Sequence, residues 1–144
     1  KEILVMSSGE KIPPADLEMA IIQEPLFDQV MVVGEGRPCL AALLVLNRRE
    51  WEKLASSIGL EVDAVESLAH PAVQTAALAG IKAALRSFPR YARVRAVYLT
   101  LEPWSVENGL ITPTMKLRRS AIEQRFAEEI IQLYAGSRSP DLCF

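Results

Sequence analysis

Length, composition and charge already exclude several classes of protein. The chain has 144 residues, half of them apolar, so it is long enough for one domain with its own hydrophobic core. Its formal net charge of −2 gives no sign of a nucleic-acid-binding surface, and no run approaches the roughly 18 apolar residues of a membrane-spanning helix. We therefore expect a globular domain that neither binds nucleic acid nor crosses a membrane.

The first half of the chain predicts short strands and helices separated by strong turn signals. An apolar run is followed by a Ser-Gly turn, two prolines open a helix, and Pro25 ends it. Two further apolar runs flank a glycine-containing connection, which is typical of a hairpin, and the next segment is apolar on one helical face up to Gly59. The expected elements are a strand at 3–6, a helix at 13–24, a hairpin at 29–46 and a helix at 48–58.

The second half predicts the longest helix, one more strand and a final helix. After a connector, apolar residues recur at helical spacing until Pro89 stops them. A partly alternating apolar run then predicts a strand, and a long loop leads to the last helical pattern. The expected elements are a helix at 71–88, a strand at 94–101, a loop at 102–116 and a helix at 117–135.

Together these elements predict an α+β fold, in which a small mixed sheet and a β-hairpin are flanked by helices. We expect residues 1–135 to form one domain. The tail at 136–144 has no periodicity and is expected to be disordered.

The loop before the last helix presents a single lysine. Asn108 and Gly109 form a strong turn dipeptide, and Pro113 keeps Thr112 extended. Lys116 therefore lies where a loop meets a helix, and its long side chain can reach an anion. By position alone it is most simply an exposed lysine, although a cation near a helix start is slightly disfavoured by the helix dipole.

The segment around this lysine resembles the last core motif of adenylate-forming enzymes. Its residues Thr112-Pro113-Thr114-Met115-Lys116-Leu117-Arg118-Arg119 are most similar to the long-chain acyl-CoA synthetase version of that motif. The resemblance implies that Lys116 is catalytic and bridges the carboxylate of the acid and the phosphate oxygens of ATP. It also implies that Thr112, Pro113 and Thr114 support the loop.

The start of the chain resembles the crossover segment of the same family. A basic residue, Lys1, precedes an apolar strand, and a Ser-Gly turn and a proline-led helix containing Leu-Glu follow. The resemblance implies that Lys1 is the hinge of a domain rotation. It also implies that a loop lines the tunnel for CoA, with Gly9 allowing close backbone approach; its residues are Ser8, Gly9, Glu10 and Lys11. On local grounds alone, this loop is an ordinary hairpin turn.

Both resemblances imply the C-terminal lid domain of a fatty acyl-CoA synthetase. Such an enzyme joins a fatty acid and ATP, with Mg²⁺, to give acyl-adenylate and pyrophosphate, and CoA then displaces AMP. We expect the partner to be the enzyme's own N-terminal adenylation domain, and we expect the full-length enzyme to bind ATP, CoA and Mg²⁺. This chain alone should then be nearly inactive and bind no metal. We expect a cytoplasmic enzyme that could associate peripherally with a membrane.

Two other functions stay open within this fold. The enzyme could be an acyl-AMP ligase that hands its product to a carrier protein instead of CoA. The domain could also be a non-catalytic interaction module, although the intact approach to Lys116 argues against a degenerate loop.

For several other residues the sequence indicates an ordinary structural role. Glu18 is expected to be a solvated or capping carboxylate, His70 to mark a helix entry, and Trp104 to pack and steady the loop of Lys116. A basic cluster around Pro89 is most simply a solvated face, but it could contact the 3′-phosphate of CoA or the large domain. Its members are Arg86, Arg90, Arg93 and Arg95.

Overall fold

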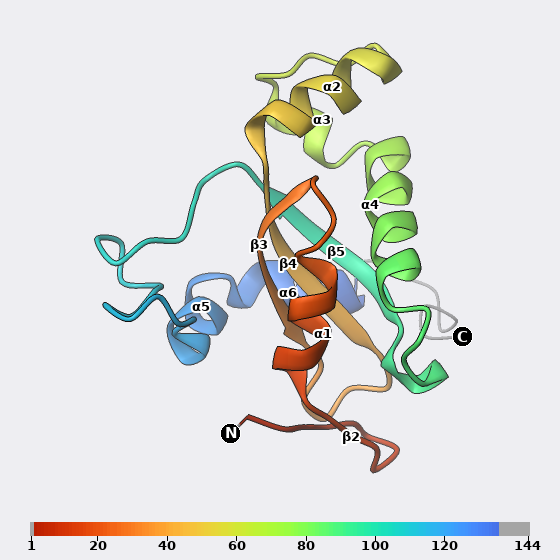
Figure 1. Ribbon diagram of the computed structural model, residues 1–144, viewed down its shortest axis with the longest axis vertical. Helices are drawn as coiled ribbons and strands as arrows, with labels where there is room; N and C mark the ends of the chain where they lie inside the picture. Colours follow the sequence, from red (N-terminus) through yellow and green to blue (C-terminus); the bar gives the residue numbers. More distant parts are fainter. Residues whose placement is uncertain (1, 136–144) are drawn as a thin grey trace.

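The computed structural model describes residues 2–135, and a three-stranded sheet lies at its centre (Figure 1). The strands are β3 (Phe27–Val33), β4 (Leu40–Leu46) and β5 (Val94–Thr100), in the spatial order β3-β4-β5. β3 pairs with β4 antiparallel, while β4 pairs with β5 parallel, so the sheet is mixed. The predicted α+β class, with its hairpin and small mixed sheet, is therefore confirmed.

The position of β4 at the centre of the sheet explains why its sequence is apolar without interruption. All seven residues of β4 are buried, because helices cover both faces of the sheet. Leu40, Ala42 and Leu44 join one hydrophobic cluster, whereas the alternating residues Ala41 and Leu43 join the other. A half-buried strand would have shown polar residues at every second position.

Four helices pack on the first face and at one end of the sheet. They are α1 (Pro14–Ile21), α2 (Arg48–Ile58), α3 (Val65–Leu68) and α4 (Pro71–Ala84). Figure 1 shows α4 along the sheet, with α2 and α3 above it. The core on this side includes Leu17, Ile21, Trp51 and Ile81, each at most 1% exposed. Removing water from such side chains supplies most of the stabilisation of the fold.

The helix α2 has the bounds that the sequence predicts. The side chain of Asn47 accepts a hydrogen bond of 2.9 Å from the backbone N–H of Glu50, which caps the first turn. Gly59 ends the helix at φ 82°, a left-handed conformation that suits glycine. Two local signals, the cap at Asn47 and the stop at Gly59, thus set the two ends of this helix. His70 caps α4 in a similar way, as expected of a helix entry.

Three predicted helices differ from the structure. The helix expected at 13–24 is α1, which ends at Ile21, and residues 22–23 form a turn before Pro25. The helix expected at 71–88 ends at Ala84, and residues 85–87 form turns before Pro89. The single helix expected at 117–135 is two helices, α5 (Arg119–Arg125) and α6 (Ala127–Ala135), separated at Phe126. Phe126 leaves the helical region at φ −110° and ψ 26° and packs its ring near Tyr98 and Trp104, at centroid distances of 5.6 and 6.4 Å. Aromatic packing on the second face therefore overrides local helix propensity.

The N-terminal hairpin consists of β1 (Leu4–Val5) and β2 (Lys11–Ile12), at the foot of the molecule in Figure 1. It is attached to the turn between β3 and β4, since the N–H of Gly36 donates to the Val5 carbonyl at 2.8 Å and that of Ser7 to the Arg37 carbonyl at 3.0 Å. Lys1 and the tail at 136–144 lie outside the described residues. Within residues 2–135, no helix is both long and apolar enough to cross a membrane.

Tyr134 attaches the end of α6 to the turn between β3 and β4, and this contact gives a pH-dependent prediction. Its hydroxyl donates to the carbonyl of Cys39 at 2.8 Å, and burial raises the pKa of Tyr134 from its ordinary value of about 10 to about 12. The folded state therefore holds this proton longer than the unfolded state does. Stability from this group should be full below pH 10 and be lost as pH rises towards 12. In Tyr134→Phe, the free energy of unfolding measured by chemical denaturation should no longer fall because of this group between pH 10 and pH 12. If it falls with pH as steeply as in the wild type, the assignment to Tyr134 is contradicted.

Candidate functional site

The loop that carries Lys116 is closed by hydrogen bonds across its base. Ile111 and Leu117 form an isolated antiparallel bridge, and the N–H of Thr112 donates to the carbonyl of Lys116 at 2.8 Å. In return the N–H of Lys116 donates to the hydroxyl of Thr112 at 3.0 Å. That hydroxyl also lies 3.1 Å from the hydroxyl of Thr114. Thr112 therefore holds both the N–H and the carbonyl of Lys116, and Thr114 contacts Thr112.

The tip of this loop has an uncommon backbone conformation. Among the described residues, Met115 is the non-glycine residue with positive φ, at 68°. A side chain in this region is disfavoured, so the surrounding hydrogen bonds must hold it there. One of them runs from the N–H of Met115 to the carbonyl of Thr112 at 2.8 Å. The result is a tight turn that leaves the side chain of Lys116 exposed.

The base of the loop is anchored on β3 through Gln29. Its amide group donates to the carbonyl of Trp104 at 3.0 Å and accepts from the N–H of Trp104 at 2.8 Å. The indole itself is 4% exposed and packs in the second core. Farther along, the side chain of Asn108 accepts from the N–H of Ser105 at 2.9 Å. Trp104 thus packs at the foot of the loop, as predicted from the sequence.

A buried ion pair next to the loop was not predicted from the sequence. Glu18 on α1 and Arg119 at the start of α5 form a two-pronged contact at 2.5 and 2.8 Å, and Glu18 also accepts from the N–H of Val32 at 2.8 Å. The side chains are 10% and 20% exposed. The hydrogen bonds that Arg119 donates to Glu18 raise the pKa of Arg119 above its ordinary value. The expectation of a solvated or capping Glu18 is therefore wrong: it joins α1, β3 and α5.

Lys116 borders a groove of about 720 Å³ between α1 and the loop. The groove also contains both members of the ion pair, together with Gln29 from β3. Two methionines flank it with large exposed surfaces, Met19 at 70% and Met115 at 76%. The exposed methionines suit contact with another protein surface, and the ammonium group of Lys116 suits contact with an anionic ligand held there.

The second predicted loop is the tight turn of the N-terminal hairpin. The N–H of Met6 donates to the carbonyl of Glu10 at 2.8 Å, and that of Gly9 donates back to Met6 at 2.9 Å. Gly9 has φ 97°, and a Cβ there would meet no atom within 4 Å, so the constraint is the backbone conformation and not space. Ser8 donates to the carboxylate of Glu10, and Lys11 lies exposed on β2.

The structure does not bring these two loops together. The groove at Lys116 is lined by no residue of the turn at Gly9, and a small cavity beside Ser8 and Glu10 is lined by no residue of the Lys116 loop. In Figure 1 the hairpin lies at the foot of the molecule, whereas the chain leading to α5 projects to one side. Within residues 2–135, no three side chains of the His, Cys, Asp and Glu types gather as a metal-binding group. The loop of Lys116 and the turn at Gly9 therefore lie on separate parts of the surface.

Comparison with known proteins gives the family. Curated relatives include the long-chain-fatty-acid–[acyl-carrier-protein] ligase AEE15 of Arabidopsis thaliana, 30% identical over 94% of this chain and 17% of that protein. They also include the putative fatty-acid–CoA ligase fadD11 of Mycobacterium tuberculosis, 28% identical over 99% of this chain and 25% of that protein. The chain thus spans a quarter or less of the length of these relatives.

Solved structures agree with the observed architecture. The A-PCP didomain of carboxylic acid reductase from Segniliparus rugosus matches with a TM-score of 0.79 and 25% identity, over 94% of this chain and 18% of that one. An acyl-CoA synthetase of Brucella canis, 20% identical with a TM-score of 0.55 over 90% of this chain and 20% of that one, supports the fold alone. The sequence model described as AMP-binding enzyme C-terminal domain matches residues 1–138, and this chain belongs to that family.

Proposed function

We propose that this chain is the C-terminal domain of an enzyme that activates a fatty acid as acyl-adenylate and passes the acyl group to a thiol. The observation that carries the proposal is Lys116, whose backbone is fixed by Thr112 while its ammonium group stays exposed beside a groove. Relatives of the chain named as fatty-acid–CoA ligases support the substrate class.

In the first step a carboxylate oxygen of the fatty acid attacks the α-phosphorus of ATP. The new P–O bond forms as the bond to pyrophosphate breaks, and acyl-adenylate results. Two anions must approach each other, so a fixed ammonium group lowers their repulsion and stabilises the charge that grows on the α-phosphate. Lys116 is the group that we assign to this role. ATP, Mg²⁺ and most of the acyl chain would be held by an N-terminal adenylation domain.

In the second step the thiol attacks the acyl carbonyl of the adenylate. A C–S bond forms, the bond to the AMP oxygen breaks, and the thiol proton is released. We propose that the turn at Gly9 lines the path of this thiol, and that the domain rotates about Lys1 between the steps. The separation of the two loops supports this division, because one orientation could present only one of them to a shared active site.

The thiol acceptor is either CoA or the phosphopantetheine arm of a carrier protein. Relatives named as fatty-acid–CoA ligases favour the first, while AEE15, named as an acyl-carrier-protein ligase, keeps the second as a candidate. We favour CoA as the principal proposal.

The proposal is tested with the full-length protein that contains this chain. Fatty acid should be required for exchange of pyrophosphate into ATP, and CoA should yield acyl-CoA faster than a carrier protein yields its acyl thioester. The 144-residue chain alone serves as the control and should be nearly inactive, since it would lack the adenylation domain. Robust acyl-CoA formation by that chain, or no fatty-acid-dependent exchange by the full-length protein, would overturn the proposal.

A further inference from the structure

The end of the Lys116 loop is tied to the rest of the domain by one carboxylate. Glu18, on α1, accepts from both terminal nitrogens of Arg119 at 2.5 and 2.8 Å, and one of the same oxygens accepts from the N–H of Val32 at 2.8 Å. Three hydrogen bonds, from α5 and β3, therefore meet on one side chain of α1. A two-pronged guanidinium contact sets orientation as well as distance, so the start of α5 is fixed in both.

The two residues between Lys116 and Arg119 carry this constraint to the lysine. Arg118 donates its N–H to the carbonyl of Leu110 at 2.9 Å, and Leu117 forms the antiparallel bridge at the base of the loop. No residue of this short segment is therefore free of a backbone contact or of the ion pair. A shift of Arg119 would move the point from which the side chain of Lys116 leaves the domain.

The ion pair faces the same groove as the lysine but offers little to a ligand there. Glu18, Arg119 and Lys116 all line the groove of about 720 Å³. The two members of the pair are only 10% and 20% exposed, whereas Lys116 is exposed. The charged ends of Glu18 and Arg119 are bonded to each other. The pair is therefore suited to holding the loop and not to binding an anion.

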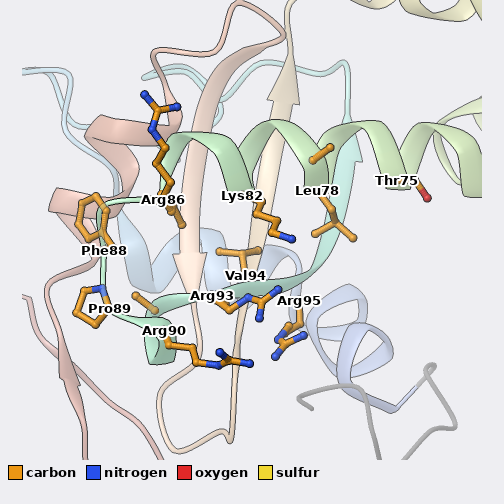
Figure 2. A pocket seen from close by; sticks show the side chains of 13 residues that line it. Thr75, Leu78, Lys82, Arg86, Phe88, Pro89, Arg90, Arg93, Val94 and Arg95 are labelled. Carbon is orange, nitrogen blue, oxygen red and sulfur yellow. The ribbon is translucent and has the colours of Figure 1, made fainter.

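The basic cluster around Pro89 shows the opposite arrangement. Figure 2 shows these side chains around a pocket of about 670 Å³ between α4 and the segment that leads into β5, and no carboxylate lines it. Within residues 2–135, none of its cations forms an ion pair. They are Lys82, Arg86, Arg90, Arg93 and Arg95. Arg119 differs from all of them, because its two terminal nitrogens already donate to Glu18.

The energetics of a buried ion pair also favour a geometric role. The cost of taking two charges out of water largely offsets their attraction, so apolar side chains of similar volume are often at least as stabilising. A catalytic group that is misplaced by about 1 Å, in contrast, can lose about 10²-fold in rate. The contact between Glu18 and Arg119 therefore matters more for the position of the loop than for the stability of an equivalent apolar contact.

We propose that Glu18 is a positioning residue for adenylate formation, and that through Arg119 it fixes the place from which Lys116 reaches the α-phosphate. The proposal rests on the proposed function, in which Lys116 acts in that step. Glu18 touches neither the fatty acid nor ATP, and the thiol step does not depend on it.

The first test is a double-mutant cycle in the full-length protein, measured as fatty-acid-dependent exchange of pyrophosphate into ATP. With Lys116 present, Glu18→Gln should lower the kcat of exchange at least about tenfold and keep the KM for ATP within about twofold. In the Lys116→Ala background the same substitution should cost less than about twofold, because no ammonium group remains to be misplaced. An equal loss in both backgrounds would overturn the proposal, since Glu18 would then act through the fold as a whole.

Two further variants separate geometry from charge and from stability. Arg119→Lys keeps the charge but cannot form the two-pronged contact, so it should also slow the exchange at least about fivefold, and only with Lys116 present. Ile81→Ala leaves a cavity in the first core, away from the loop, and should keep the exchange within about twofold of the wild type while the protein is folded. A loss in Ile81→Ala as large as in Glu18→Gln would overturn the proposal. If Glu18→Gln does not fold, Arg119→Lys decides, and wild-type exchange by that variant would overturn it.

The thiol step provides an internal control. From supplied acyl-adenylate, Glu18→Gln should form the thioester within about twofold of the wild-type rate, because Lys116 is not used there. A loss as large as that of adenylate formation would overturn the positioning role.

Amide hydrogen exchange of the 144-residue chain separates this proposal from the proposed function. If Lys116→Ala makes adenylate as fast as the wild type, the role assigned to Lys116 is wrong, and the geometric part of the proposal is decided by this measurement alone. Glu18→Gln should speed exchange of the N–H groups of Lys116 and Arg118 at least about tenfold more than that of Glu50, whose N–H is capped on α2. Equal changes at the loop and at Glu50 would show that Glu18 does not position the loop, whatever the reaction.

Discussion

Replacing Lys116 with alanine is expected to slow acyl-adenylate formation in the full-length enzyme by about 10²–10³-fold, which corresponds to roughly 2.7–4 kcal/mol of lost transition-state stabilisation. The loop should keep its shape, because the contacts of this residue with Thr112 are made by the backbone at 2.8 and 3.0 Å and survive the substitution. The loss should therefore come from the ammonium group alone. Fatty-acid-dependent exchange of pyrophosphate into ATP measures it.

The neighbouring variant Arg118→Ala provides the matched control for this experiment. Arg118 is also an exposed cation, it lies two residues farther along, and among residues 2–135 it makes no ion pair. Its removal should change the exchange rate by only a small factor. If both variants slow the exchange equally, the loop contributes general positive charge and Lys116 has no special role.

Replacing Glu18 with glutamine is expected to destabilise the 144-residue chain by about 3 kcal/mol, towards the lower end of the cost of breaking a buried ion pair, since Arg119 keeps some contact with solvent. The variant leaves a guanidinium in a partly buried site without its carboxylate. It also weakens the contact to the N–H of Val32. Chemical denaturation measures the change in the free energy of unfolding.

Two comparisons sharpen this prediction. Glu123→Gln, on the exposed side of α5, should cost less than about 0.5 kcal/mol. The double variant Glu18→Gln/Arg119→Gln should recover part of the loss, because no unpaired charge remains buried. A Glu18→Gln variant as stable as Glu123→Gln would show that the ion pair does not hold α1 and α5 together.

The parts of the fold that local signals determine could be predicted from the sequence. Asn47 and Gly59 cap α2 at both ends, so its predicted bounds at 48–58 are confirmed. The apolar run of β4 indicated one strand of a hairpin, and its pairing with β3 is confirmed, whereas the burial of both its faces is a finding of the structure. The family could also be identified, because its motifs lie in two short continuous segments.

The parts that depend on distant contacts could not be predicted. Glu18 and Arg119 are 101 residues apart, and nothing in the pattern around either one indicates a partner. The break at Phe126 serves aromatic packing against Tyr98 and Trp104, whereas the local pattern favours one continuous helix. The sequence did suggest the basic cluster around Pro89, but only the fold adds Lys82 from α4 and shows the shared pocket.

The central claim is that one domain serves two chemical steps with two separate loops. The most direct measurement compares both half-reactions of the full-length enzyme in Lys116→Ala and in Gly9→Ala, where the new side chain strains a backbone at φ 97°. We expect Lys116→Ala to lose adenylate formation and to keep thiol transfer from supplied acyl-adenylate, and Gly9→Ala to show the reverse. If each variant slowed both half-reactions to the same extent, the two loops would not have separate roles, and the account would be contradicted.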